Sequence, residues 1–296
     1  MFKDIDIFVA AAQAIWNGQD PYRLAGMEAF YPLPFYFLFL PFAWLPLPVV
    51  HALWSGMSGI VFVAILKRRA LPAMLSAQAL LTFLLGQVDI VMMGLYAMIQ
   101  SGGKRGGIAL AFLVLKPHIV LLLAPFLLWR WWQTNRRQLW WFLAVGSVLA
   151  LASFILQPNW AFSLLARSGE RMRVSISSSL WGMLSFLPAP VWFGVVVLIA
   201  VALIVWVWRW KNVDAVETLG LFLSPFIFAY NYIPLYTMFK SSRVLLAMAA
   251  LSWFGFWIAD MQSNDRASAL VAVFAIILFA RQWLRERHSQ KPDEGG

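Results

Sequence analysis

Two carboxylates open the chain, just before most of it turns apolar. Asp4 and Asp6 stand at the start of residues 5–16, whose apolar side chains recur with helical spacing until Asn17-Gly18 ends the stretch. A carboxylate held near a reacting hydroxyl group can accept its proton as a general base. On a helix, side chains two residues apart point about 200° away from each other. Both residues are candidates for such a base, but they cannot address the same hydroxyl group.

Asp89 and Lys116 are further ionisable residues that interrupt apolar stretches. Asp89 closes the Gly-Gln-Val-Asp break that contains Gln87, and Lys116 opens the Lys-Pro-His break that contains His118. Charges at membrane depth are costly and are candidates for function. Lys116 with His118 would suit a phosphate group; alternatively, Lys116 pairs with Asp89 as a structural contact. The histidines show no metal-ligand spacing and cysteine is absent, so no metal site is expected.

The composition indicates a membrane protein. Of 296 residues, 62% are hydrophobic and 12% are charged, whereas soluble domains carry about 25% charged residues. The apolar runs are long and do not alternate with a period of two, so helices rather than a barrel are expected. The net charge of +10 comes from Lys and Arg clusters at the ends of apolar runs, as membrane topology and contact with anionic lipid require. A nucleic-acid partner is therefore not expected.

The pattern predicts an all-α, polytopic transmembrane bundle of about 8–10 spanning or half-spanning helices. No internal repeat is visible, so we expect one domain, 1–296. Its expected parts are an outward juxtamembrane segment at 1–30, the helical bundle at 31–284 and a cytoplasmic tail at 285–296.

Polar residues interrupt the apolar runs at several positions, and the number of spans in residues 29–66 is open. Residues 29–66 carry no acidic or basic residue except His51. Their length fits either two spans or one span with a re-entrant segment. Polar breaks are expected at 86–89, 116–118 and 230–232.

The sequence also predicts how the segments near the two ends of the chain are placed. The apolar stripe of 5–16 suits a helix in the membrane interface, with Trp16 and Tyr22 at the level of the lipid headgroups. The basic and then polar stretch from Arg281 onward is expected to fray.

The basic clusters orient the bundle. They lie at 67–69, 104–105, 130–137, 209–211, 240–243 and 281–287. If they face the cytoplasm, the polar breaks and the loop 157–187 face outward, where broken helices would line a cavity. If residues 1–30 are also outside, residues 31–66 must cross the membrane an odd number of times.

Short motifs recur along the chain in a family order. They are D-x-x-I-F from Asp4, G-x-D-P-Y ending at Tyr22, Y-P-x-P from Tyr31, Gly86–Asp89, Leu115–His118, Ser179–Gly182, and Leu-Ser-Pro from Leu223 followed by Tyr230-Asn231-Tyr232. The ordered set resembles the polyprenyl-phosphate-mannose-dependent mannosyltransferases of glycosyltransferase family 87, within the GT-C superfamily. Phe8 stands where tyrosine is common in the family, and Asp89 stands where asparagine is.

The resemblance implies a GT-C-like hexosyltransferase of the plasma (inner) membrane, with its site facing outside. It would move a hexose, with mannose expected, from a polyprenyl-phosphate donor to a lipid or glycan acceptor, without a cofactor. Asp4 best fits the place of the family's general base, with Asp6 as its competitor. The family pattern also places a transmembrane helix before this aspartate, which the sequence as given lacks.

Further residues are expected to contact the substrates. They are Tyr22, Tyr31, Gln87, Asp89, Lys116, His118, Arg171, Arg173, Tyr230, Asn231 and Tyr232. Lys116, with Arg171 or Arg173, would stabilise the charge of the leaving phosphate; the two arginines also fit a solvated loop.

Two other functions remain open at this point. Broken helices with charges at the break also serve transporters and flippases of lipid-linked substrates. Transporters usually carry paired repeats, and none is visible here. An inactive relative that keeps the fold is the third possibility.

Overall fold

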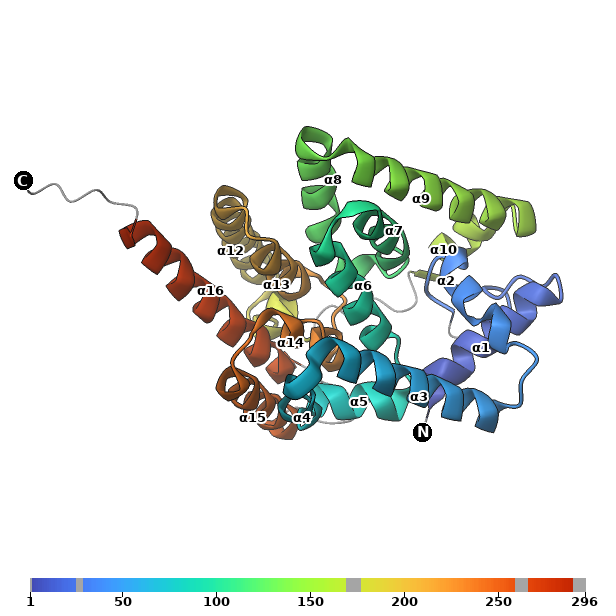
Figure 1. The fold of residues 1–296 in the computed structure, drawn as a ribbon, viewed down its shortest axis with the longest axis horizontal. Coiled ribbons are helices and arrows are strands. Elements are labelled where there is room, and N and C mark those ends of the chain that lie inside the picture. The colour runs from blue at the N-terminus through green and yellow to red at the C-terminus, as the bar shows by residue number, and fades with distance from the viewer. Residues whose placement is uncertain (1, 25–28, 169–176, 259–265, 290–296) are drawn as a thin grey trace, which may run out of the picture.

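The computed structural model describes residues 2–24, 29–168, 177–258 and 266–289, which form helices and no strands (Figure 1). The α-helices are α1 Lys3–Trp16, α2 Leu33–Tyr36, α3 Leu47–Leu66, α4 Ala70–Met74, α5 Ala77–Leu85, α6 Asp89–Ser101, α7 Gly103–Leu113, α8 Leu123–Thr134, α9 Arg136–Leu156, α10 Trp160–Ser168, α11 Leu180–Met183, α12 Ala189–Trp210, α13 Val213–Leu223, α14 Leu235–Met238, α15 Ser242–Ile258 and α16 Leu270–Ser289. Short 3₁₀ turns are η1 Phe37–Phe42, η2 Lys67–Arg69, η3 Pro117–Ile119, η6 Ala229–Tyr232 and η7 Arg266–Ala269. The expected all-α class is confirmed.

Several helices are long and apolar enough to cross a membrane. Among the described residues there are 4 of them: Leu47–Met74, Arg136–Leu156, Ala189–Trp210 and Arg266–Ser289. A fifth span is present if α5 and α6, which are bent by 116° at their break, are counted as one. Much of α9 and α12 is exposed apolar surface, as expected for helices that face lipid. The chain is therefore a polytopic membrane bundle.

The structure decides between the two readings of the proline-rich run 29–66. The segment Leu33–Phe42 is a short apolar stretch made of α2 and η1, whereas Leu47–Leu66 alone has the length of a span. Pro46 precedes α3 with an extended backbone, and Pro48 lies in its first turn, where a proline lacks only a hydrogen bond that the helix would not make. One crossing in this run also meets the odd-number condition.

Helix α1 is present, but its partner is not lipid. The predicted end is confirmed, because α1 ends at Trp16 and Gly18 follows with φ +71°. Ile5 and Phe8 are at most 4% exposed, and the Phe8 ring packs against that of Phe35 at 5.1 Å. The expectation of an interfacial helix is thus wrong for this stripe. An apolar stripe looks the same to lipid and to a protein core, so spacing alone could not distinguish them.

Tyr22 is held by protein contacts, and the end of the chain departs from expectation. Tyr22 is buried, and its hydroxyl donates to the Tyr31 carbonyl at 2.7 Å. The stretch from Arg281 does not fray at once, because α16 continues to Ser289. Glu286 stabilises this end by accepting hydrogen bonds from Gln282 and from Trp210.

The basic clusters, although distant in sequence, gather at one end of the bundle. Arg69 donates to the Phe239 carbonyl at 2.7 Å, beside the 240–243 cluster. The Trp210–Glu286 bond joins the 209–211 and 281–287 clusters. A pocket lined by Gly102, Arg130, Gln138 and Asn212 collects the ends of helices that carry the other clusters.

This arrangement predicts a labelling pattern in a chain that has no cysteine of its own. Ala166 is exposed on α10, and Gln133 is exposed near the end of α8. By the positive-inside rule, an impermeant maleimide should label Ala166→Cys in intact cells and Gln133→Cys only after permeabilisation. The unchanged chain is the control for background. Labelling of Gln133→Cys alone in intact cells would overturn the orientation.

Helices α7 and α9 pack closely where they cross (Figure 1). A Cβ atom added at Gly107 would overlap the Gln138 carbonyl oxygen and lie 3.0 Å from the Trp141 Cβ. Small residues let helix backbones approach in membranes, where packing rather than hydrophobicity drives association. Gly146 on α9 has no such neighbour within 4 Å.

We therefore expect Gly107→Ala to destabilise the bundle by about 1–3 kcal/mol, the usual cost of overpacking. Gly146→Ala should be neutral or slightly stabilising, because alanine favours a helix over glycine. Thermal unfolding of the detergent-solubilised variants measures both effects. Equal stability of the two variants would show that α7 and α9 do not approach this closely.

Candidate functional site

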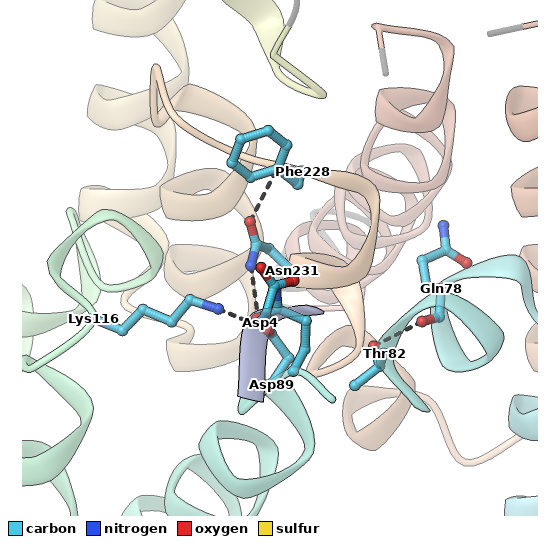
Figure 2. A network of polar contacts seen from close by, with 8 residues as sticks. Asp4, Gln78, Thr82, Asp89, Lys116, Phe228 and Asn231 are labelled. Carbon is cyan, nitrogen blue, oxygen red and sulfur yellow. Dashed lines mark hydrogen bonds and ion pairs between the residues drawn. The ribbon is translucent and has the colours of Figure 1, made fainter. Parts of the chain in front are cut away.

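A buried ion pair forms the centre of the candidate site. The Lys116 ammonium lies 2.6 Å from Oδ2 of Asp89, and both side chains are 0% exposed (Figure 2). Lys116 follows α7 directly before η3, and Asp89 is the first residue of α6. The structural pairing considered for Lys116 is therefore present, and it joins two of the predicted breaks.

The α5–α6 break has a local cause. Gly86 ends α5 with φ +68°, and a Cβ atom there would lie 2.7 Å from Cγ2 of Ile5 on α1. Glycine alone adopts this backbone without strain and leaves room for α1. The resulting 116° bend turns Asp89 into the protein, where Lys116 meets it.

Asn231 completes the coordination of Asp89. Its Nδ2 donates to Oδ1 of Asp89 at 2.8 Å, so both carboxylate oxygens accept a hydrogen bond (Figure 2). Its Oδ1 accepts from the backbone N–H of Phe228 at 2.8 Å, which holds the amide in that orientation. The third predicted break, at 230–232, therefore meets the other two through this side chain.

Two tyrosine rings lie close to the same ammonium group. Nζ of Lys116 is 6.0 Å from the ring centroid of Tyr31 and 5.5 Å from that of Tyr230. The His118 ring stacks on Tyr31 with centroids 6.0 Å apart. Aromatic faces attract a cation at these distances. Tyr31, His118 and Tyr230 are half-buried, so they lie between the ion pair and the surface.

Asp4 reaches this cluster through Gln87. Gln87 Nε2 donates to Oδ2 of Asp4 at 2.5 Å, and Gln87 is 3% exposed. The Phe2 N–H also donates to the Leu84 carbonyl at 2.8 Å, which ties the start of α1 to the end of α5. The half-buried Asp4 carboxylate therefore lies beside the α5–α6 break, in which Gln87 precedes Asp89 by two residues (Figure 2).

Asp6 has a different partner. Its Oδ1 lies 2.6 Å from Nε2 of His51, and the His51 ring stacks on Phe2 with centroids 4.4 Å apart. The Asp6 and His51 side chains are 37% and 23% exposed. The two aspartates therefore address different groups, as their helical spacing predicts. The His51 contact was missed, and the one signal for it was an ionisable residue in an otherwise uncharged run.

Tyr22 belongs to a second polar group, built on α10. Ser163 donates to Oδ2 of Asp20 at 2.7 Å, and Arg167 donates to the Tyr22 carbonyl at 2.6 Å. Burial, with the nearby Tyr36 and Asp20, raises the pKa of the Tyr22 hydroxyl, so this group stays protonated at neutral pH. A cavity of about 500 Å³ lies beside it. Sequence reasoning did not connect α10 with this turn.

The remaining candidates differ in placement. Tyr232 is fully buried and its hydroxyl donates to the Ser178 carbonyl, so it supports η6 from the protein side. Arg171 and Arg173 lie outside the described residues. The structure thus brings together Asp4, Gln87, Asp89, Lys116, Tyr31, His118, Tyr230 and Asn231. A carboxylate beside a buried cation with an aromatic border can take up a proton next to a bound anion.

Comparison with known proteins gives one match. The model of glycosyltransferase family 87 matches residues 29–230, more than half of the chain. No curated protein and no solved structure matches. The matched range contains Gln87, Asp89 and Lys116, and it begins after Asp4.

The geometry predicts what loss of one charge does. Lys116→Met leaves a buried carboxylate uncompensated and should cost about 3–5 kcal/mol of stability. Adding Asp89→Asn removes that charge and keeps the Asn231 contact, so the double variant should recover most of the loss. Asp6→Asn breaks a more exposed pair and should cost about 0–1 kcal/mol.

Thermal unfolding in detergent measures all three variants. A Lys116→Met variant as stable as the unchanged chain would contradict the buried pair. Equal losses in the single and the double variant would show that Lys116 contributes by packing rather than by charge.

Proposed function

Because this chain belongs to glycosyltransferase family 87, we propose that it transfers a hexose, mannose in particular, from a polyprenyl-phosphate donor to a lipid or glycan acceptor. The observation that supports this most is the position of Asp4. Gln87 links this carboxylate to the break that holds the buried Lys116–Asp89 pair. A base and a cation thus lie at the same break in the chain, and glycosyl transfer from a phosphate uses both.

The proposed reaction is one displacement at the sugar's anomeric carbon. The acceptor oxygen forms a bond to C1 from the face opposite the phosphate, and the bond from C1 to the phosphate oxygen breaks. Asp4 takes the acceptor's proton, and the lipid phosphate leaves with the electron pair. The transition state is oxocarbenium-like, as in glycoside chemistry. A phosphate is a good leaving group, so no acid is needed.

Lys116 is the group we assign to the leaving phosphate. An ammonium group has three N–H donors, and Asp89 accepts from it in the structure. Tyr31 and Tyr230 form the border over which the phosphate would approach. In this proposal Asp89 and Asn231 position Lys116, and Arg171 and Arg173 add charge from the outer loop.

Asp4 is preferred to Asp6 as the base. The partner of Asp4, Gln87, adjoins Asp89 in the α5–α6 break. Asp6 is oriented by His51 on α3 instead. Since a helix turns the two carboxylates apart, a substrate bound at Lys116 would meet Asp4.

The same arrangement supports the side of the membrane that we propose. The basic clusters gather at one end of the bundle, and the three polar breaks meet through Asp89. By the positive-inside rule, the breaks then face outward across the plasma (inner) membrane. Such a site would take the donor from the outer leaflet and the acceptor from the outer aqueous side.

The decisive test compares two amide variants at matched membrane expression. Asp4→Asn keeps the size of the side chain and removes its basicity, so transfer from polyprenyl-phosphate mannose should fall by about a hundred- to ten-thousand-fold. Asp6→Asn should lose much less. Transfer of labelled mannose to lipid extract in membranes gives the rates, and donor binding is measured separately. A near-normal Asp4→Asn enzyme, or an inactive Asp6→Asn enzyme, would reject the assignment.

A further inference from the structure

A second polar pocket lies at the other end of the helices that carry the Asp89 cluster. It has a volume of about 470 Å³ and is formed by the ends of α6 and α8, the start of α9 and the start of α13. Asp89 begins α6 and Gln100 stands near its end, about 16 Å away along the helix axis. The pocket is therefore separate from the cluster proposed for sugar transfer.

Gln138 is the buried polar group of this pocket. It lines the cavity from the first turn of α9 and is 6% exposed. Its side-chain amide makes no hydrogen bond to any residue in the described ranges of the chain. Because Gln138 lines the cavity, its amide is free to bond to a polar group that enters it.

Arg130 brings a positive charge to the same cavity. It is exposed and lines the pocket, and within the described part of the chain it forms no ion pair. The basic clusters around this end add to the positive field. A guanidinium group presents a planar set of donors that matches a phosphate, so the charge of the pocket favours an anionic ligand.

Asp214 adds an acceptor that suits a hydroxyl group. Its Oδ1 accepts from the Tyr96 hydroxyl at 2.7 Å and from Gln100 Nε2 at 2.5 Å. These bonds orient the carboxylate, while burial raises its pKa. Its other oxygen accepts no hydrogen bond from the residues that the structure covers. Trp131, 5% exposed, supplies a flat apolar wall.

We propose that this pocket binds a phosphate ester of a hydroxyl-rich ring, such as a sugar phosphate or an inositol phosphate. Arg130 contacts the phosphate, whereas Gln138 and Asp214 bind ring hydroxyl groups and Trp131 packs against the ring. The volume lies within the usual range for small-molecule sites. The ligand comes either from solution or from the headgroup of a membrane lipid, since both carry the same chemistry.

Calorimetry on the full chain in neutral detergent tests the soluble source. Glucose 1-phosphate should bind more tightly than inorganic phosphate or glucose alone. Arg130→Gln should weaken it by about ten- to a hundred-fold, the size of one charge-assisted contact. Because Arg130 lies away from Lys116, such a loss assigns binding to this pocket. Lys104→Gln removes a charge at the same end of the bundle without touching the pocket, and should leave binding unchanged.

Lipid nanodiscs test the membrane source. Retention of phosphatidylinositol over phosphatidylglycerol, measured by native mass spectrometry and lost in Arg130→Gln, would identify a lipid headgroup as the ligand. Gln138→Leu should weaken either ligand, and Arg130→Gln decides alone if that variant does not fold. Three results would overturn the proposal: no binding of either ligand, equal binding of inorganic phosphate and glucose 1-phosphate, or equal losses in Arg130→Gln and Lys104→Gln.

Discussion

The burial of two opposite charges determines how this bundle is built around its site. An isolated ion in a water-poor interior costs several kcal/mol, and an ion pair is tolerated only with close geometry and further hydrogen bonds. Lys116 and Asp89 meet this condition at 2.6 Å, with Asn231 on the second oxygen. These three residues come from three different breaks in the chain. The pair can exist only when those breaks meet, so helix ends, rather than helix faces, organise this region.

The opposite ends of the same helices have a different chemistry. Asp89 is buried at the start of α6. Near the end of the same helix, Gln100 donates a hydrogen bond that helps to orient Asp214 at the start of α13. The end near Gln100 carries exposed basic residues, as the positive-inside rule requires of one side of a membrane protein. The end near Asp89 holds one buried lysine, Lys116. This member of family 87 thus has a polar cluster at each end of α6.

Several expectations failed for a common reason. The stripe of α1 was correctly predicted as helical, yet Ile5 and Phe8 pack on protein rather than lipid. Asp6 was expected only as a competitor of Asp4, and its contact with His51 was not foreseen. In each case the local pattern predicted the helix or the ionisable residue correctly, but it did not predict which residues that group contacts. Hydrophobic spacing reports that a face is buried, but it carries no information about which surface covers it.

The sequence by itself determined the properties that depend on composition and local backbone chemistry. These are the all-α membrane class, the ends of helices at Gly18 and Gly86, and the polar breaks. Tertiary structure alone decided the pairing of groups far apart in the chain: Lys116 with Asp89 across 27 residues and Gln87 with Asp4 across 83. Such pairs depend on how rigid helices pack, and a small change in packing would move the side chains out of contact. Local sequence preferences act over a few residues, so they do not determine contacts between residues this far apart in the chain.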